Sequence, residues 1–279
     1  MLRVAIPNKG ALSEAATTML REAGYSLRSS AKTLVHRDID NEVEFFYLRP
    51  RDIAIYVGRG ILDIGITGRD LLGESGADAT EVMSLGFGKS RFHYAGPAGD
   101  FSDPAELAGK TIATSYPRLV EADLAARGID ATTVKLDGAV EVSIELGVAH
   151  AIADVVETGT TLRLAGLETF GEPIMYSEGV LIAQGSVPDK ARVLKSRLES
   201  VIVARDYVLI DYDIRKDDLE KAIALTPGFE SPTVSDMQDP AWLAVRSLVS
   251  RKESHRVMDR LHEAGARAIL VTALASCRI

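Results

Sequence analysis

The chain has 279 residues and a formal net charge of −8, and it is 46% hydrophobic and 26% charged, which excludes a small single module, a disordered chain and a fibrous repeat. Its basic residues are scattered and its one cysteine is Cys277, so neither a nucleic-acid surface nor an internal disulfide framework is expected. No uncharged apolar run approaches the roughly 18 residues of a membrane span, and residues 1–6 read as a strand rather than an export signal, which favours a cytoplasmic protein without a membrane partner.

The first part of the chain alternates predicted strands and helices. A strand at 2–6 leads through the loop Pro7-Asn-Lys-Gly10 into an amphipathic helix that ends at Gly24. A strand at 43–48 leads through Arg49-Pro-Arg51 into a helix at 52–57, and a strand at 62–66 ends in the loop Thr67-Gly-Arg-Asp70. This alternation predicts a parallel sheet, and such sheets bind ligands beyond the carboxyl ends of their strands.

The same order of elements recurs between residues 111 and 161. A strand, a loop at Tyr116 and Pro117 and a helix are followed by a strand at 133–136, a short helix at 140–146, a strand at 151–156 and a second Thr-Gly loop. We therefore expect an α/β protein with two lobes facing each other across a cleft. The predicted boundaries are 1–89 with about 177–190 for lobe I, and 90–176 for lobe II.

The segment from Asp154 to Thr161 is the most informative part of the chain. A predicted buried strand ends in an acidic residue and opens into a loop with Gly159 between threonines. Glycine lets backbone N–H groups approach an anion, threonine hydroxyls donate hydrogen bonds, and the start of the next helix adds partial positive charge. Asp154 and Glu157 would repel a bare phosphate but suit a phosphorylated sugar, whose hydroxyls donate hydrogen bonds, or a divalent cation. The alternative is that the threonines only cap the helix.

Basic residues in the loops of the first lobe have two interpretations each. Lys9 follows the first strand, where it can reach a phosphate or remain a solvated lysine. Arg49 and Arg51 flank Pro50, a favoured first helical residue, and either guanidinium can pair with polyphosphate or form an exposed salt bridge. Residues 86–90 contain glycine, lysine and serine without the spacing of a nucleotide-binding P-loop, so a hinge is favoured there.

The acidic candidate residues also allow more than one interpretation from the sequence alone. Asp70 and Leu71 suit an acceptor and an apolar wall for a purine ring, but Asp70 also suits a helix N-cap. Glu141 lies in the first turn of its predicted helix, where the helix dipole favours a carboxylate whatever its function. The five histidines lack metal-binding spacing, and no Ser, His and Asp combination stands out, so covalent catalysis is not supported.

Residues 205–279 follow a different pattern from the two lobes. The predicted elements are a strand at 207–212, a helix at 217–225, strands at 232–237 and 242–249, a helix at 253–264 and a strand at 268–274. This β-α-β-β-α-β order predicts a ferredoxin-like module. Residues 190–204 are expected to form a helical connector.

Several segments taken together resemble the long form of the ATP phosphoribosyltransferase family. They are Pro7-Asn-Lys-Gly10, the stretches 48–57 and 62–70, Leu136-Asp-Gly-Ala-Val-Glu141, the loop 154–161, and 226–233 in the tail. The resemblance covers nearly the whole chain and implies two periplasmic-binding-protein-like lobes that form a catalytic cleft, followed by a regulatory domain at 205–279. It also implies a magnesium requirement, feedback inhibition by histidine, AMP as a further ligand, and dimers that assemble into hexamers.

The resemblance assigns roles position by position. The 5-phosphate and ribose of phosphoribosyl pyrophosphate would contact Asp154, Val155, Glu157, Thr158, Gly159, Thr160 and Thr161. ATP or AMP would contact Lys9, Arg49, Asp70, Leu71 and Ser90, with Lys9, Arg49 and Glu141 as the catalytic residues. Histidine would contact Asp213, Phe229, Thr233, Leu248 and Ala268, although position 229 more often carries leucine in similar proteins. Because Asp154 and Glu157 are not adjacent, unlike the acidic pair of other phosphoribosyltransferase classes, magnesium is expected mainly on pyrophosphate oxygens.

The implied reaction is a direct displacement. Adenine N1 of ATP would attack C1′ of phosphoribosyl pyrophosphate and expel pyrophosphate with inversion, while Glu141 would accept a proton from the adenine amino group. Two rivals remain from the sequence. A solute receptor or effector sensor with the same two lobes predicts closure without turnover, and an amino-acid sensor built on the tail would leave the Thr-Gly loop unexplained.

Overall fold

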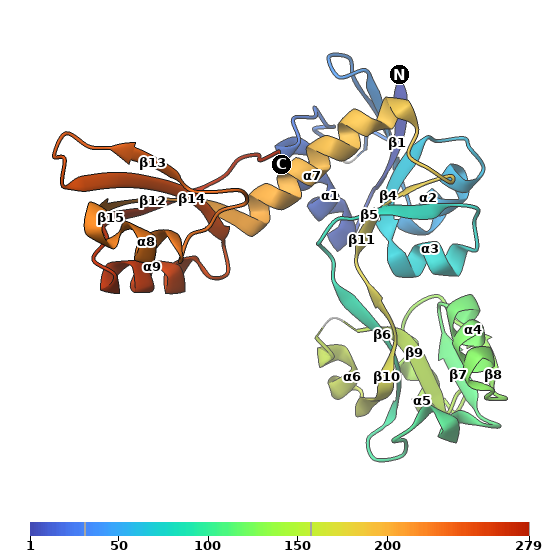
Figure 1. Cartoon of the computed structure of the whole chain (residues 1–279). Helices are drawn as coiled ribbons and strands as arrows, with labels where there is room; N and C mark the ends of the chain where they lie inside the picture. The colour runs from blue at the N-terminus through green and yellow to red at the C-terminus, as the bar shows by residue number, and fades with distance from the viewer. Residues whose placement is uncertain (31, 157, 279) are drawn as a thin grey trace. The chain divides into compact units, whose positions relative to one another are not determined.

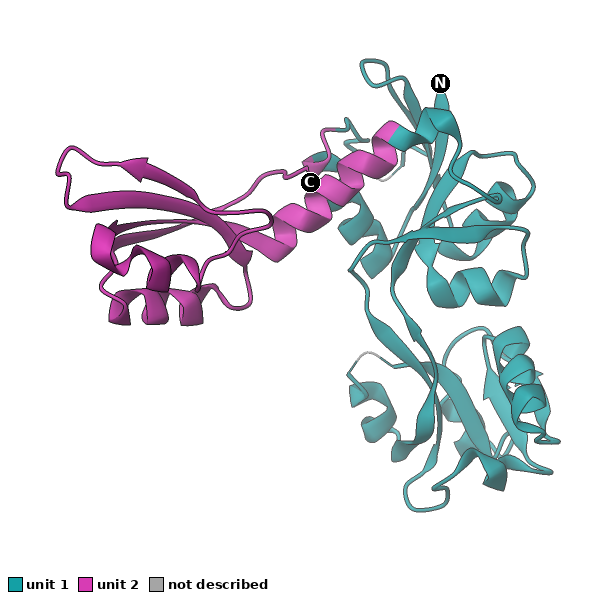
Figure 2. Cartoon of the chain, viewed as in Figure 1, with its two compact units in different colours: residues 1–21, 25–192 teal, residues 22–24, 193–279 magenta. Residues whose placement is uncertain are grey.

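The computed structural model describes residues 1–30, 32–156 and 158–278, and these divide into two compact units (Figure 2). The first unit comprises residues 1–21 and 25–192, and the second comprises 22–24 and 193–279. Within the described ranges, no helix has both the length and the apolar character that a membrane span requires.

The first unit contains two sheets (Figure 1). Lobe I is the sheet with strand order β2-β3-β1-β4-β11-β5 and its helices, and lobe II is the sheet with order β10-β6-β9-β7-β8 and its helices. The strands of lobe I are β1 Leu2–Pro7, β2 Val35–Asp38, β3 Val43–Leu48, β4 Ile64–Gly68, β5 Thr80–Ser84 and β11 Gly179–Ala183. Those of lobe II are β6 Ser90–Pro97, β7 Thr111–Thr114, β8 Thr132–Lys135, β9 Ala151–Val156 and β10 Leu167–Ser177.

The repeated element order predicted from the sequence is confirmed by the sheet topology. In lobe I, β1 lies parallel to β3 and β4, and in lobe II, β7 lies parallel to β8 and β9. The prediction of parallel sheets is right for these six strands only. Each sheet also contains a strand antiparallel to its neighbours, β11 in lobe I and β6 in lobe II, because the chain crosses between the sheets after β5 and again after β10.

Helices pack against these sheets through apolar faces. They are α1 Ala11–Glu22, α2 Pro50–Gly58, α3 Arg69–Ser75, α4 Pro117–Arg127, α5 Val142–Glu145 and α6 Thr160–Leu164, with a 3-10 turn at Pro104–Leu107. Helix α2 lies on the lobe I sheet through Ile53, Ala54 and Val57, which are fully buried. Gly65 of β4 permits this approach, since a Cβ at that position would lie 2.6 Å from Cγ2 of Ile53.

Several expected boundaries are corrected by the structure. The third strand of lobe I is Ile64–Gly68 rather than 62–66, so the first two residues of the loop expected at 67–70 belong to the strand and the last two begin helix α3. Helix α5 is confined to Val142–Glu145 instead of 140–146. These shifts matter because they change the backbone setting of Asp70 and Glu141.

The second unit consists mainly of a long helix and a four-stranded sheet. Helix α7 Arg192–Asp206 precedes the sheet, which has the strand order β13-β14-β12-β15. Its strands are β12 Tyr207–Arg215, β13 Thr233–Asp236, β14 Trp242–Ser250 and β15 Arg267–Ala273, and its helices are α8 Leu219–Ile223 and α9 Ser254–Glu263. Every pairing is antiparallel, so the predicted ferredoxin-like order is confirmed.

Candidate functional site

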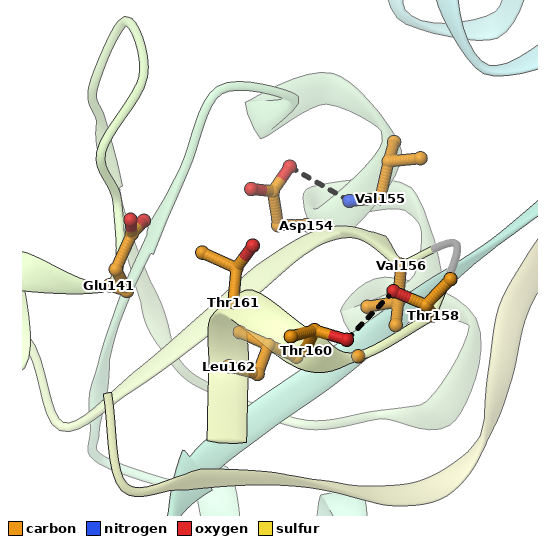
Figure 3. A pocket seen from close by; sticks show the side chains of 9 residues that line it. Glu141, Asp154, Val155, Val156, Thr158, Thr160, Thr161 and Leu162 are labelled. Atoms are coloured by element: carbon orange, nitrogen blue, oxygen red, sulfur yellow. Dashed lines mark hydrogen bonds between the residues drawn. The ribbon is translucent and has the colours of Figure 1, made fainter. Parts of the chain in front are cut away.

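The Thr-Gly loop lies at the carboxyl end of β9, the middle strand of the lobe II sheet. Together with Glu141 it lines a cavity of about 400 Å³, whose other lining residues are Asp154, Val155, Val156, Thr158, Gly159, Thr160, Thr161 and Leu162 (Figure 3). Glu157 was also assigned to this site, but it lies outside the described residues. The structure therefore brings the described members of the predicted sugar-phosphate site together with Glu141.

The backbone of the loop is arranged for hydrogen-bond donation. Gly159 is the N-cap residue of α6 and has φ 71°, a left-handed conformation that glycine adopts without strain. In the described part of the chain, no acceptor pairs with the backbone N–H groups of residues 158–161. Among the described residues, therefore, nothing competes with an anion for these amides.

The threonines do not cap the helix, which removes the alternative interpretation of the loop. Helix α6 has no side-chain cap, and the hydroxyls of Thr158 and Thr160 lie 3.1 Å apart in a hydrogen bond to each other. Thr158, Thr160 and Thr161 are all exposed to solvent. Because α6 has only five residues, an anion bound at this loop would depend more on the amides and hydroxyls than on the helix dipole.

Asp154 is the most strongly perturbed carboxylate of the cavity. Burial is the main cause that raises its pKa, and the nearby charge of Glu141 adds to this. The N–H of Val155 donates to Asp154 Oδ1 at 2.8 Å, and the positive charge of Arg51 also opposes the rise. A buried carboxylate with few donors gains stabilisation when a ligand hydroxyl donates to it.

The main-chain setting of Glu141 differs from the sequence-based expectation. Glu141 is the N-cap position of α5 rather than part of its first turn, and its side chain does not cap the helix. The preceding loop contains Gly138 with φ 94° and Ala139 with φ 49°. A positive φ at alanine is uncommon, so the loop that aims Glu141 at the cavity is conformationally strained.

His93 is a neighbour of Asp154 that sequence reasoning did not select. In the antiparallel pairing of β6 and β9, His93 is the direct partner of Asp154. Its side chain is buried, which lowers its pKa, and its Nδ1 has no hydrogen-bond partner in the described residues. A neutral imidazole therefore lies on the strand next to Asp154. Only the strand register shows that His93 and Asp154 are neighbours.

Two of the residues predicted to contact the nucleotide follow the carboxyl ends of strands of lobe I. Lys9 and Arg49 are exposed in the loops after β1 and β3. Neither Arg49 nor Arg51 takes part in an ion pair with a described residue, so the salt-bridge interpretation finds no support. Lys9 and Arg49 therefore remain accessible at the edge where a ligand is expected.

Asp70 is held by a contact that the sequence did not indicate. The N-cap of α3 is Gly68, so Asp70 is not a cap, and it is 7% exposed. Its Oδ1 accepts a hydrogen bond of 2.7 Å from the hydroxyl of Ser177. The backbone N–H of Asp70 donates to the oxygen of that hydroxyl at 3.0 Å. Ser177 in turn pairs across the sheet with Ser90, so the structure brings two predicted nucleotide residues, Asp70 and Ser90, to one serine.

Residues 85–89 connect the two sheets, as the hinge interpretation requires. Gly86 and Gly88 have φ 74° and 62°, and the N–H of Gly86 donates to Glu178 of the second crossing at 3.1 Å. Arg69 of α3 ties the second crossing to lobe I, because it forms ion pairs with Glu178 at 3.2 Å and with Glu81 of β5 at 2.7 Å.

Of the predicted histidine-contacting residues, only some lie together. Phe229, Thr233 and Leu248 line a cavity of about 470 Å³ in the second unit. Phe229 packs on Tyr207, with ring centroids 4.6 Å apart. Asp213 and Ala268 do not line this cavity but lie where β12 and β15 pair irregularly, and Ala268 has φ 47°.

The donor set of the first unit does not form a metal cage by itself. No group of three or more His, Cys, Asp or Glu side chains that could hold a metal ion occurs in the described ranges. Glu141 and Asp154 do line the same cavity. Two carboxylates beside an anion cradle suit a magnesium ion that takes most of its ligands from water and substrate oxygens.

Comparisons with known proteins agree on one family. A family model described as ATP phosphoribosyltransferase matches residues 49–202, and one described as the HisG C-terminal domain matches residues 204–276. Proteins named ATP phosphoribosyltransferase from Pseudarthrobacter chlorophenolicus and Streptomyces coelicolor are 60% and 59% identical, each over 100% of both chains. The solved ATP phosphoribosyl transferase (HisG:HisZ) complex from Thermotoga maritima matches with a TM-score of 0.61 and 28% identity, over 72% of this chain and 98% of that one.

Proposed function

Because the chain belongs to the ATP phosphoribosyltransferase family, we propose that it transfers the 5-phosphoribosyl group of phosphoribosyl pyrophosphate to N1 of ATP and releases pyrophosphate, the first step of histidine biosynthesis. The full-length identity to relatives of that name carries this conclusion. The cavity at the end of β9 supports it independently, since free amides, hydroxyls and two carboxylates suit a phosphorylated sugar.

The residues of the Thr-Gly loop would bind and orient the sugar phosphate. The amides of residues 158–161 and the threonine hydroxyls would donate to the 5-phosphate, as the backbone geometry at Gly159 allows. Asp154 would accept hydrogen bonds from the ribose hydroxyls, which offsets the cost of its burial. Glu157 shares this assignment from the sequence alone.

The nucleotide would approach from the carboxyl edge of lobe I. Lys9 and Arg49 would neutralise phosphate charge, while Asp70, Leu71 and Ser90 would contact the nucleoside part. The reaction needs no protein nucleophile, because adenine N1 attacks C1′ as pyrophosphate leaves with inversion. The protein's contribution is then to orient two anionic substrates and to stabilise developing charge.

Glu141 is the proposed acceptor for the proton of the adenine amino group. Its place in the same cavity as Asp154 supports this role, because the sugar carbon under attack must lie close to the loop that holds its phosphate. Magnesium would be held mainly by pyrophosphate oxygens, with Glu141 and Asp154 as the nearest carboxylates of this chain. When bound, the ion neutralises charge on the leaving pyrophosphate.

The proposed organisation assigns residues 1–89 with about 177–190 to one catalytic lobe, 90–176 to the other, and 205–279 to a regulatory domain. Histidine would inhibit by binding the regulatory domain at Asp213, Phe229, Thr233, Leu248 and Ala268. The match of the C-terminal family model and the cavity that contains three of these residues support the assignment. AMP as a further ligand, a dimer and hexamer assembly, and a cytoplasmic location complete the proposal.

The test is a direct assay. The protein is mixed with ATP, phosphoribosyl pyrophosphate, magnesium and pyrophosphatase, and the near-ultraviolet change of N1-alkylated adenine is followed with and without histidine. Turnover that histidine suppresses supports the enzyme and its regulation, and turnover insensitive to histidine contradicts the regulatory assignment alone. Ligand binding without turnover would instead favour the sensor.

A further inference from the structure

Arg51, near the start of α2, makes three contacts with lobe II. Its Nη1 donates to the carbonyl oxygen of Ser115 at 3.0 Å, and its Nη2 donates to Ser115 Oγ at 3.1 Å. Its guanidinium carbon lies 4.6 Å from the centroid of the Tyr116 ring. Ser115 and Tyr116 form the turn between β7 and α4, so one side chain of lobe I fixes two consecutive residues of lobe II.

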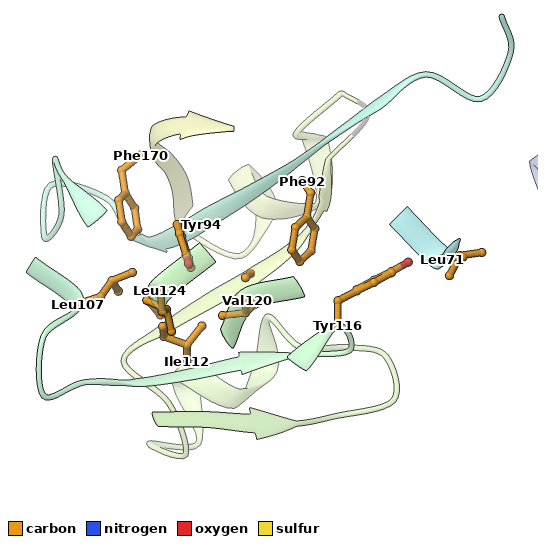
Figure 4. Packing of buried hydrophobic residues seen from close by; sticks show 11 residues of the cluster. Leu71, Phe92, Tyr94, Leu107, Ile112, Tyr116, Val120, Leu124 and Phe170 are labelled. Atoms are coloured by element: carbon orange, nitrogen blue, oxygen red, sulfur yellow. The ribbon is translucent and has the colours of Figure 1, made fainter. Parts of the chain in front are cut away.

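Tyr116, which belongs to lobe II, contacts residues of α3 in lobe I. Its ring is 8% exposed and packs on Phe92, with centroids 5.2 Å apart, and it points toward Leu71 of α3 (Figure 4). Its hydroxyl lies beside Asp70, and burial together with this carboxylate raises the pKa of Tyr116, so the phenol stays protonated and can donate. Asp70 is also held by Ser177 at the second crossing.

These contacts form a series that runs from Arg51 through Tyr116 to Asp70. Separation of the lobes would break both Ser115 hydrogen bonds, unstack the tyrosine and leave Asp70 with Ser177 as its remaining side-chain partner. A further contact joins the lobes at the same seam, where the N–H of Leu119 donates to Glu74 at 3.1 Å. Separation of the lobes would therefore remove one of the two described side chains that contact Asp70.

We propose that Arg51 is a positioning residue that couples lobe closure to the orientation of Asp70 on the nucleotide side of the cleft, acting through Tyr116. This inference rests on the proposed function, since it assigns the coupling to ATP binding. In this role the geometry of the Arg51 guanidinium matters, and a positive charge at position 51 would not be sufficient. The planar guanidinium donates two hydrogen bonds to Ser115 and lies over the Tyr116 ring, a combination that a lysine ammonium cannot reproduce.

The experiment measures kcat and the KM for ATP and for phosphoribosyl pyrophosphate in five variants of the full chain. They are Arg51→Gln, Arg51→Lys, Tyr116→Phe, the double variant Arg51→Gln/Tyr116→Phe, and the control Arg59→Gln. Arg59 follows the same helix, is exposed, and its side chain has no hydrogen bond or ion pair with a described residue. Thermal melting establishes which variants are folded.

Both Arg51 variants are expected to raise the KM for ATP by about tenfold, the scale of a lost hydrogen bond to a charged group. Tyr116→Phe should raise it as well, and the double variant should be no worse than Arg51→Gln, because contacts in series do not add. The control should stay within about twofold of the wild type, since surface substitutions have small effects.

Three results would overturn the inference. The first is a wild-type KM for ATP in Arg51→Lys, which would mean that a positive charge is sufficient. The second is additive effects on this KM in the double variant. The third is a rise in the KM for ATP in Arg59→Gln as large as that in Arg51→Gln. If Arg51→Gln does not fold, Arg51→Lys and Tyr116→Phe decide. If the wild type shows no turnover, the proposed function fails, and the same comparison is made with the Kd for ATP measured by calorimetry.

Discussion

Replacing Gly159 by alanine tests whether the Thr-Gly loop binds the sugar phosphate, because its effect on ligand affinity can be measured apart from its effect on stability. Replacement by alanine places a Cβ 3.8 Å from Cγ1 of Val156, an ordinary contact, so the cost comes from the backbone rather than from a clash. A left-handed φ of 71° at a residue with a Cβ costs about 1–2 kcal/mol. For a unit of this size that corresponds to a Tm lower by roughly 2–8 °C.

A matched control exists elsewhere in lobe II. Gly109 has the same φ of 71° and no heavy atom within 4 Å of its would-be Cβ, but it does not line the cavity. Gly109→Ala should therefore lose similar stability and keep its affinity for phosphoribosyl pyrophosphate. Gly159→Ala should raise that Kd by about 10- to 100-fold, because a relaxed loop withdraws amides from a charged phosphate.

Calorimetric titration with phosphoribosyl pyrophosphate and magnesium, beside thermal melting of both variants, measures the two effects. Equal Kd values for Gly159→Ala and Gly109→Ala would refute the assignment of the loop as the phosphate cradle. A Gly159→Ala protein as stable as the wild type would refute the backbone argument, since it would mean that φ at 159 is not held positive.

Three further substitutions test individual roles. Asp154→Asn should weaken sugar-phosphate binding at least about tenfold without loss of stability near neutral pH. The raised folded pKa of Asp154 means that wild-type stability falls as pH rises from the unfolded value, near 3.9, through the folded pKa, and the asparagine variant should lack this component in denaturant titrations across pH. Glu141→Gln should lower kcat by about 100-fold if the carboxylate is the proton acceptor, and unchanged turnover would remove it from that role. Asp213→Asn should relieve histidine inhibition with kcat unchanged in the absence of histidine, and inhibition at the wild-type level would contradict the assignment.

The element order was predictable because it depends on local patterns. Alternating apolar strands, amphipathic helices and glycine stops identified both repeats of the first unit and the β-α-β-β-α-β order of the tail. The antiparallel strands β6 and β11 were not predicted, because the direction of a strand depends on which sheet the chain enters after a crossing. The start of helix α3 was not predicted correctly, because 67–70 was expected to be a loop with Asp70 as a possible N-cap, whereas the helix follows Gly68 directly.

The candidate site was predictable to the extent that its residues are consecutive in the chain. Residues 154–161 carry their donors and acceptors in one loop, so composition alone indicated an anion cradle. Ser177 and His93 carried no signal, since each reaches the site through the register of a strand distant in sequence. Glu141 was selected from the sequence, but only the cavity shows that it lies with Asp154.

The sequence by itself determined the repeated α/β order, the tail module, the Thr-Gly loop that we propose as the phosphate site, and the family resemblance, because each depends on a short stretch whose local chemistry needs no distant partner. Only the tertiary structure decided which loops meet. It placed Arg51 on Ser115 and Tyr116, Tyr116 beside Asp70, and His93 opposite Asp154, since these pairs are brought together by sheet register and lobe packing over separations that local patterns do not encode.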